Sequence, residues 1–342
     1  MSAYRVAQWA TGTIGKRSLR AVLEHPDLAL AGVYSHSAEK ARRDAGDLCG
    51  LPATGILATG SVDEILGLGA DCVLYMPRAF DQQEVVALLR AGINVVTTCG
   101  QFHHPPSMDP LLRERIEAAC AAGGSSIHST GSSPGFITEA LPLVLASVQR
   151  RVESLTIDEY ADLSQRDSPA MLFQIMGFGQ SPAEFDQARA DYLGASFGPS
   201  LRLLADAFGT PVETVTAHGE TATALRKITI AAGTIEAGTV AAQRITVSTR
   251  SPGQASLCFR ATWYCTTDID AAWHLRETGW HLDIAGDAPL DIDIRFPIPL
   301  SRMAEVSPGY TANRAVNAVP ALCAAAPGIR TTLDLPHLVG AR

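Results

Sequence analysis

The chain contains 342 residues, of which 46% are hydrophobic and 18% are charged, a composition typical of a folded protein long enough for two domains. A net charge of −8 argues against nucleic acid as the main ligand, because phosphate backbones attract clustered Lys and Arg. No basic leader with an apolar core begins the chain and no apolar run reaches about 18 residues, so a cytoplasmic protein without membrane attachment is expected. The seven cysteines form no C-x-x-C motif, which predicts reduced thiols and no metal site.

The first stretch of the chain predicts a nucleotide-binding turn between a buried strand over 4–10 and a helix over 16–24. The turn consists of Thr11, Gly12, Thr13, Ile14 and Gly15. Gly12 leaves room for phosphates beside backbone N–H groups, Gly15 lets the helix lie close to the strand, and a helix N-terminus favours negative charge. The pattern is A-x-G-x-x-G, because Ala10 takes the place of the usual first glycine.

The residues after the second predicted strand, 27–34, favour NADP(H) over NAD(H). Sites for NAD usually carry an acidic residue about 20 positions after the glycines, where it binds the ribose 2′-hydroxyl. Here that place is taken by polar and basic residues, namely Ser35, His36, Ser37, Lys40, Arg42 and Arg43. These can bind a 2′-phosphate; the alternative is an ordinary surface loop with solvated charges.

Strands and helices alternate as far as residue 150. The predicted strands are 70–76, 92–98 and 125–129, and the predicted helices are 61–66, 81–91, 110–122 and 138–148. This order predicts a Rossmann-like, doubly wound parallel sheet of about six strands. Ligands bind at the carboxyl ends of such strands. The residues expected near the nicotinamide are therefore Met76, Pro77, Cys99, Gly100, Ser133 and Pro134.

The second part of the chain has the pattern of an α+β domain with a largely antiparallel sheet. Its predicted strands are 155–160, 212–218, 221–230, 233–249, 256–264, 280–284 and 290–296, and its predicted helices are 168–179, 182–194 and 199–208. We therefore expect a dinucleotide-binding domain over 1–150 and a substrate and dimerisation domain over 151–307. A C-terminal helical segment, about 308–342, is expected to pack back on the first domain.

Two sets of motifs resemble known families. The A-x-G-x-x-G turn and the run Asp-Ala-Gly-Asp-Leu at 44–48 resemble the N-terminal domain of dihydrodipicolinate reductases. The other set resembles the 2,4-diaminopentanoate dehydrogenase group, which includes native NAD(P)H-dependent amine dehydrogenases; its segments are 131–136, 168–169, 176–179, 316–320 and 327–330. The resemblance implies an NAD(P)H-dependent oxidoreductase that acts on C=N, CH–NH or C=O groups.

The chain departs from both patterns at informative positions. The His-His, Lys and Gly-Thr-Ala segments of true dihydrodipicolinate reductases are absent, so that reaction is not expected. The resemblance implies a catalytic glutamate shortly after strand 92–98, where this chain has Gln101. A neutral amide cannot act as the carboxylate that orients ammonia or an iminium ion. Ser133 replaces the asparagine that the family loop usually carries.

Hydride transfer also requires a group that polarises or protonates the heteroatom of the substrate. His128, in strand 125–129, is one candidate because histidine titrates near neutral pH. Glu159 and Tyr160, at the end of strand 155–160, form the candidate acid pair of the second domain. The alternatives are a buried histidine bonded to the backbone and ordinary strand-end residues.

Two other groups of residues are less suited to catalysis. Adjacent His103 and His104 suggest zinc, but no carboxylate or thiol lies at a ligand spacing, so solvent-exposed loop residues are predicted. Cys99 lacks a neighbouring base that would lower its pKa, so a nucleophilic thiol is not expected.

The expected substrate is small and fairly apolar. Its pocket would be walled by Met171, Phe173, Met176 and Phe178, for which a core stripe is the alternative. The sequence thus predicts a homodimeric, NADP(H)-dependent oxidoreductase acting on a carbonyl, imine or amine. Reduction of a cyclic imine or activated C=C bond, and a catalytically inactive NADP(H)-binding sensor, stay open as alternatives.

Overall fold

The computed structural model describes residues 3–182, 185–210, 212–250, 253 and 255–340. The chain divides into two compact units, Met1–Phe136 with Ser307–Arg342, and Ile137–Val306. The sequence placed the first boundary after residue 150, whereas the chain changes unit after Phe136. The reason is local packing: helix α6 (Leu141–Ala146) contacts α7 (Gln187–Ala207), and Ser200 donates a hydrogen bond of 2.6 Å to Glu139.

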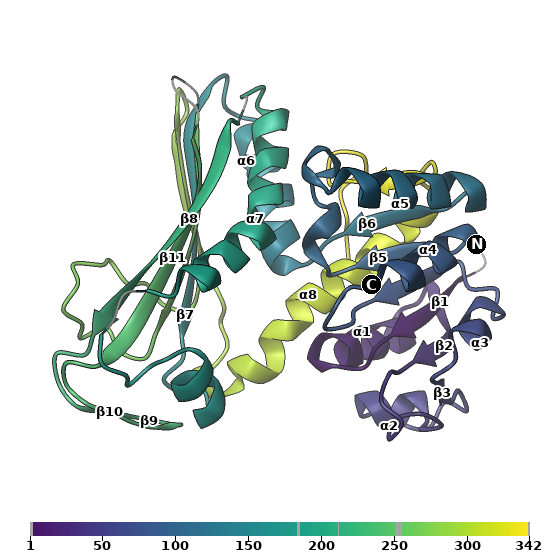
Figure 1. Ribbon diagram of the computed structural model, residues 1–342, viewed down its shortest axis with the longest axis horizontal. Coiled ribbons are helices and arrows are strands. Elements are labelled where there is room, and N and C mark those ends of the chain that lie inside the picture. The colour runs from purple at the N-terminus through teal and green to yellow at the C-terminus, as the bar shows by residue number, and fades with distance from the viewer. Residues whose placement is uncertain (1–2, 183–184, 211, 251–252, 254, 341–342) are drawn as a thin grey trace. The chain divides into compact units, whose positions relative to one another are not determined.

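The first unit contains a parallel sheet of seven strands in the order β15-β6-β5-β4-β1-β2-β3 (Figure 1). The strands are β1 (Tyr4–Trp9), β2 (Leu28–Tyr34), β3 (Ala58–Thr59), β4 (Cys72–Tyr75), β5 (Asn94–Thr97), β6 (Ser126–Ser129) and β15 (Gly328–Arg330). The helices are α1 (Thr13–Glu24), α2 (Ala45–Cys49), α3 (Val62–Leu66), α4 (Gln82–Arg90), α5 (Pro110–Gly123) and α8 (Leu300–Cys323), which belongs to this unit from Ser307 onward. The predicted Rossmann-like fold is confirmed, with β3 and β15 as two additional strands too short to be recognised in the sequence.

Apolar side chains cover both faces of this sheet, which is why its strands are continuous hydrophobic runs. One face packs Trp9, Tyr75 and Phe102 into a core with α4 and α5, and the other packs Val6 and Leu74 against α8. Side-chain caps fix the helix starts: Asp81 accepts hydrogen bonds from two amides at the start of α4, and Asp109 accepts one from Leu112 at the start of α5.

The second unit is built on a six-stranded sheet in the order β14-β13-β7-β12-β11-β8. Its strands are β7 (Val152–Asp162), β8 (Thr214–Thr223), β11 (Val240–Arg250), β12 (Ser256–Tyr264), β13 (Gly279–Gly286) and β14 (Leu290–Arg295). Only β7 and β12 pair in parallel among these neighbours. A small hairpin, β9 (Ile228–Ile230) and β10 (Gly233–Ile235), and the helical turn Ala170–Ile175 complete the unit. The predicted α+β domain with a largely antiparallel sheet is confirmed.

Two predicted helix boundaries are wrong, both at prolines. The helices predicted over 182–194 and 199–208 form one helix, α7, with Pro199 inside it; Ala183 and Glu184 lie outside the described residues. Helix α8 likewise begins at Leu300 and continues through Pro308, whereas the C-terminal helical segment was predicted to begin at about residue 308. Continuous burial outweighs the lost hydrogen bond, since Leu201, Leu203 and Leu204 extend the buried face of α7 beyond its proline.

Candidate functional site

The first unit offers a ligand site where the strand order reverses. Strand β1 lies between β4 and β2, so the chain leaves the sheet in opposite directions on its two sides (Figure 1). In doubly wound sheets the crevice outside the carboxyl ends of the strands at this point binds ligands. The predicted cofactor residues of the first unit all follow the carboxyl ends of β1, β2, β4, β5 or β6.

The glycine turn after β1 has the shape that a pyrophosphate needs. Ala10 adopts a left-handed conformation with φ of 70°, the geometry in which glycine is usual. A side chain at Gly15 would place its Cβ 2.2 Å from the carbonyl oxygen of Ala10, whereas one at Gly12 would meet nothing within 4 Å. Gly15 is therefore required for the close packing of α1 on β1, and Gly12 faces open space.

The first turn of α1 is ready to bind an anion. Gly12 is the N-cap of this helix, no side chain caps it, and the first turn contains no acidic residue. The unpaired N–H groups and the helix dipole favour negative charge there. The residues present therefore fit the diphosphate of a dinucleotide, with Thr11, Gly12, Thr13 and Ile14 surrounding it.

A lysine from the loop after β2 reaches this turn. Lys40 Nζ donates a hydrogen bond of 3.0 Å to the carbonyl oxygen of Thr11. The loop is held by local bonds, since Ser37 N donates to Ser35 Oγ at 3.3 Å and Lys40 N donates to Ser37 O at 3.0 Å. The structure thus brings together three of the residues predicted for the phosphate, while Arg43 is exposed.

A carboxylate that the sequence did not indicate also lies beside this loop. His36 Nε2 lies 3.2 Å from Glu84 Oε1, and Tyr75 donates a hydrogen bond of 2.7 Å to Glu84 Oε2. Burial and the bond to Glu84 raise the pKa of Tyr75 above its usual range. Glu84 belongs to α4, far from β2 in sequence, so no local pattern could reveal its contact with His36.

The Asp-Ala-Gly-Asp-Leu motif has a structural role beside the basic loop. Asp44 caps α2 through Gly46 N at 2.7 Å and accepts further bonds from Thr54 and Gly55, which lower the pKa of its carboxyl group, with the Thr54 amide first among them. A Cβ at Gly46 would lie 2.0 Å from the carbonyl oxygen of Pro52. The motif therefore fixes the loop that follows Lys40 and Arg43.

The ends of β5 and β6 are joined by Ser129. Its hydroxyl donates a 2.6 Å hydrogen bond to Cys99 O and accepts a 3.3 Å bond from Phe102 N. Gln101 is exposed in the turn between them. Burial raises the pKa of the Cys99 thiol, which keeps it protonated at neutral pH. Met76 is buried directly after β4, and Pro77 follows it.

Three histidines of the first unit, His103, His104 and His128, are buried. His128 is 1% exposed inside β6, with Nδ1 2.8 Å from the carbonyl oxygen of Arg330 in β15. This is the placement of a histidine bonded to the backbone, the alternative to a proton donor. The prediction that His103 and His104 are solvent-exposed is wrong, because both are buried; His104 Nδ1 lies 2.9 Å from Ser107 Oγ. Among the described residues no group of three or more His, Cys, Asp or Glu could hold a metal ion.

The loop that carries Ser133 and Pro134 is anchored to α8. Ser132 Oγ and Thr311 Oγ1 are 2.7 Å apart, and a Cβ at Gly131 would lie 3.2 Å from Thr311 Cγ2. Neither Ser132 nor Thr311 was predicted as a site residue. Their contact explains how a C-terminal segment shapes a loop at the end of β6.

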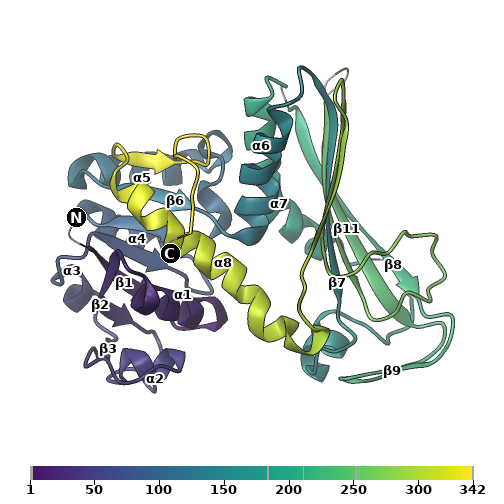
Figure 2. The ribbon, with the colours of Figure 1, turned by 180° about the vertical axis from the view of Figure 1, so that it is seen from behind.

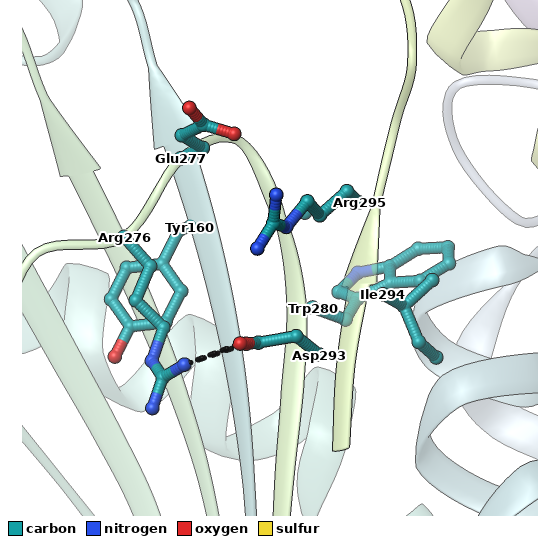
Figure 3. Close-up of a pocket in the computed structure, with 8 residues that line it drawn as sticks. Tyr160, Arg276, Glu277, Trp280, Asp293, Ile294 and Arg295 are labelled. Carbon is teal, nitrogen blue, oxygen red and sulfur yellow. Dashed lines mark hydrogen bonds and ion pairs between the residues drawn. The ribbon is translucent and has the colours of Figure 1, made fainter.

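In the second unit Glu159 and Tyr160 are separate candidates, because consecutive strand residues face opposite sides of a sheet. Glu159 Oε2 accepts a 3.0 Å hydrogen bond from the indole of Trp280. Tyr160 lines a cavity of about 220 Å³ together with Arg276, Gly279 and Arg295 (Figure 3). Burial raises the pKa of Tyr160, which keeps its phenol protonated.

The four residues predicted to wall a substrate pocket belong to one hydrophobic cluster. Met176 and Phe178 are buried in it, and Met171 and Phe173 are partly buried against it. Arg189 of α7, which sequence reasoning missed, donates a 3.0 Å hydrogen bond to Met176 O and fastens the end of this segment. The arrangement matches the alternative of a core stripe.

Comparison with known proteins decides the family. The sequence model of one protein family, the 2,4-diaminopentanoate dehydrogenase C-terminal domain, matches residues 136–341. The chain belongs to this family. The expectations of a 2,4-diaminopentanoate dehydrogenase-like chain and of an NAD(P)H-dependent oxidoreductase are therefore confirmed.

Individual relatives agree with this assignment. An amine dehydrogenase of Streptomyces virginiae is 24% identical over 96% of this chain and 95% of its own, and 2,4-diaminopentanoate dehydrogenase of Acetoanaerobium sticklandii is 27% identical over 43% of each. Among solved structures, amine dehydrogenase from Mycobacterium smegmatis superposes with a TM-score of 0.77 at 19% identity, covering 99% of this chain and 97% of its own. Within the described residues, no helix is long and apolar enough to cross a membrane.

We expect alanine at Gly12 to weaken dinucleotide binding and alanine at Gly15 to lower the stability of the fold. Gly12→Ala should leave the free energy of unfolding within about 1 kcal/mol of wild type, because its Cβ meets no atom of the protein, yet weaken dinucleotide binding at least tenfold, by about 1.4 kcal/mol, by filling the phosphate space. Gly15→Ala should destabilise the chain by about 1–3 kcal/mol. Urea unfolding and fluorescence titration with NADPH measure the two effects, and unaltered binding by the Gly12 variant would contradict the assigned site.

Proposed function

We propose that the protein prefers NADP(H) to NAD(H) and transfers a hydride to or from a small, fairly apolar carbonyl, imine or amine. The observation that carries the cofactor preference is the position of Lys40, whose ammonium group lies 3.0 Å from the carbonyl oxygen of Thr11 in the glycine turn. Ser35 and Ser37 add hydroxyl donors, and no carboxylate occupies positions 35–37. A 2′-phosphate would find one cation and two hydroxyls there.

The nearby carboxylate does not oppose this preference. Glu84 already accepts a hydrogen bond from Tyr75 and faces His36. Both carboxylate oxygens of Glu84 are therefore engaged by neighbouring side chains. The ammonium group of Lys40 then makes the local charge positive, and a positive charge favours the extra phosphate of NADP(H).

The reaction chemistry depends on the end of β5. The bound nicotinamide supplies or accepts the hydride. At this strand end, Gln101 offers an amide that can donate a hydrogen bond to a substrate oxygen or nitrogen but cannot take up a proton from ammonia. This favours a carbonyl, or an imine formed before binding, as the group that is reduced.

Two alternatives rest on the same residue. Reduction of a cyclic imine or an activated C=C bond also handles no ammonia, so Gln101 is compatible with it. A catalytically inactive NADP(H)-binding sensor is favoured by the absence of the glutamate that the family resemblance implies. We further propose a homodimer as the working state, with the second unit supplying the contact.

The cofactor preference predicts a selective effect of one lysine. Lys40→Met should weaken NADPH binding about tenfold or more, because a charge-assisted hydrogen bond contributes about 1.5–3 kcal/mol. NADH binding should change by less than about threefold, well under 1 kcal/mol. Thermal shifts with each cofactor report this by linkage.

Lys227→Met serves as the matched control, since Lys227 pairs with Glu236 in the second unit. Wild-type protein that is stabilised equally by NADPH and NADH would refute the preference.

The chemistry predicts that ammonia is not required. With a ketone or aldehyde panel, NADPH oxidation by the wild type should proceed equally with and without ammonium chloride. Gln101→Glu should gain ammonia-dependent turnover, because it supplies a carboxylate at the end of β5. Gln101→Asn keeps an amide and should gain none.

The outcome also separates the alternatives. Ammonia-dependent turnover by the wild type would contradict the role given to Gln101. Tight NADPH binding without turnover of carbonyls, imines or activated alkenes would support the sensor.

A further inference from the structure

Two cysteines from distant parts of the sequence meet on one face of the first sheet. Cys72 is the first residue of β4, and Cys323 is the last residue of α8. Figure 2 shows the C-terminal part of α8, in yellow, along this sheet. The two side chains belong to the same hydrophobic cluster, in which Cys72 is buried and Cys323 is partly buried against it.

The two thiols are close enough to interact directly. Cys323 Sγ lies 3.8 Å from the carbonyl oxygen of Asp71, the residue that precedes Cys72. Cys72 Sγ lies 3.7 Å from the carbonyl oxygen of Val73. Burial and, after it, a hydrogen bond with the Cys323 thiol raise the pKa of Cys72 well above its usual range. Both cysteines are free thiols in this structure.

The two thiols differ in their access to solvent. Cys72 is 0% exposed, so its sulfur is shielded from oxidants in water, and its raised pKa keeps it protonated. Cys323 is only half-buried, at the end of a helix. A partly exposed thiol with a second thiol beside it is the arrangement in which oxidation ends as a disulfide.

A bond between these sulfurs would hold together two distant segments of the chain. The sequence between them includes the whole second unit, Ile137–Val306. After Cys323 the chain forms β15, which pairs with β6 through three residues, and Ser126 Oγ donates a 2.9 Å hydrogen bond to the carbonyl oxygen of Ala326. A covalent link at the end of α8 would therefore fasten the segment that completes the first sheet.

We propose that Cys72 and Cys323 form a peroxide-responsive dithiol, which closes to a disulfide and fastens α8 to β4. Hydrogen peroxide oxidises the Cys323 thiol to a sulfenic acid and is itself reduced to water. The sulfur of Cys72 then attacks the sulfenic sulfur, and the hydroxyl group leaves as water with the proton of the Cys72 thiol. Two thiols and one peroxide thus yield one disulfide and two water molecules, and a dithiol reductant reverses the change.

The disulfide would leave the candidate cofactor site open. Cys72 begins β4, whereas the predicted cofactor residues Met76 and Pro77 follow the carboxyl end of this strand. The crosslink therefore acts on the stability of the first unit rather than on ligand access. It can be measured in the absence of any cofactor.

Peptide mapping after peroxide treatment tests the disulfide. Wild-type protein treated with a small excess of hydrogen peroxide should lose two of its seven thiols, and a non-reducing map should join the peptides that contain Cys72 and Cys323. The melting temperature should rise by about 5 °C or more, because a crosslink that closes a long loop restricts the unfolded chain. Dithiothreitol should restore both the thiol count and the melting temperature.

Two variants separate the steps of the reaction. Cys323→Ser should form no crosslink and keep Cys72 as a thiol, because the buried sulfur does not meet the oxidant. Cys72→Ala should leave the Cys323 sulfenic acid without a thiol to resolve it, so that dimedone, a reagent for sulfenic acids, labels Cys323 more strongly than in wild type. Neither variant should gain thermal stability from peroxide.

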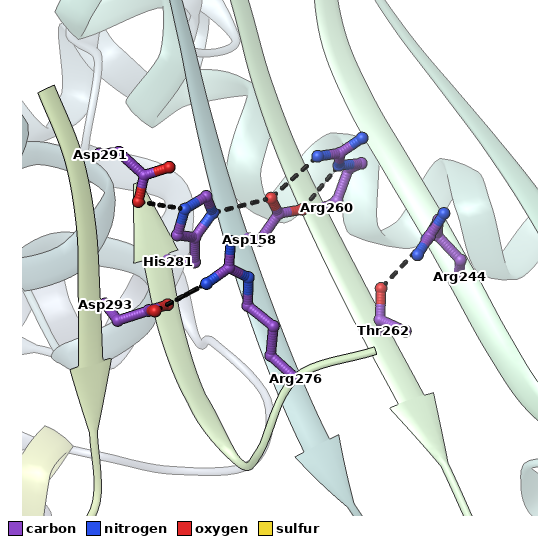
Figure 4. A network of polar contacts seen from close by, with 8 residues as sticks. All are labelled: Asp158, Arg244, Arg260, Thr262, Arg276, His281, Asp291 and Asp293. Carbon is purple, nitrogen blue, oxygen red and sulfur yellow. Dashed lines mark hydrogen bonds and ion pairs between the residues drawn. The ribbon is translucent and has the colours of Figure 1, made fainter. Parts of the chain in front are cut away.

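Cys258→Ser is the matched control, because Cys258 is also half-buried but lies on β12 of the second unit. It precedes Arg260, which bonds Asp158 in the network shown in Figure 4, and this variant should form the crosslink as readily as wild type. Near-ultraviolet circular dichroism verifies that every variant is folded. A wild type that keeps all its thiols, a disulfide that joins other cysteines or two chains, or a crosslink that survives Cys323→Ser would each overturn the proposal.

Discussion

The approach of helix α1 to strand β1 is the constraint on which the nucleotide site depends. A Cβ at residue 15 would lie 2.2 Å from the Ala10 carbonyl oxygen, so only glycine allows the helix to begin where it does. In the same turn Ala10 adopts a left-handed conformation, and no side chain of the N-cap residue caps α1. A strained residue and an uncapped helix end are each unfavourable alone. Such features persist where the surrounding structure holds the backbone in place, and β1 is held between β2 and β4.

Much of the first unit could be predicted from the sequence because its signals are local. Buried strands, capped helices and the spacing of Gly12 and Gly15 each occupy a few consecutive residues. The three-residue strand β15 could not be found in this way, since its place in the sheet comes from pairing with β6 across a long stretch of chain. The prediction failed at Pro199 for a related reason: helix breaking by proline is a local rule, and the packing of α7 on the sheet overrides it.

The candidate site also contains residues that are close together in the sequence and residues that only the fold brings together. The loop residues Ser35, Ser37 and Lys40 are local to β2, and Lys40 contacts Thr11 in the glycine turn. The pairing of His36 with Glu84 joins residues that no periodicity links. Burial of His103 and His104 was missed because a polar loop sequence does not reveal that Phe102 draws its neighbours into the core.

The region that matches the family model and the second structural unit overlap only in part. The matched region therefore also contains segments that shape the edge of the nucleotide site. The matched region begins at residue 136, where the chain enters the second unit, but it extends to residue 341 and so includes α8 and β15 of the first. Its C-terminal part contributes Thr311, which holds the loop at the end of β6, and Arg330, whose carbonyl oxygen holds His128. A substitution on α8 can therefore alter the edge of the nucleotide site without touching the glycine turn. The last segment of the chain completes the first sheet, so the nucleotide-binding unit is finished only when the C-terminus has folded onto it.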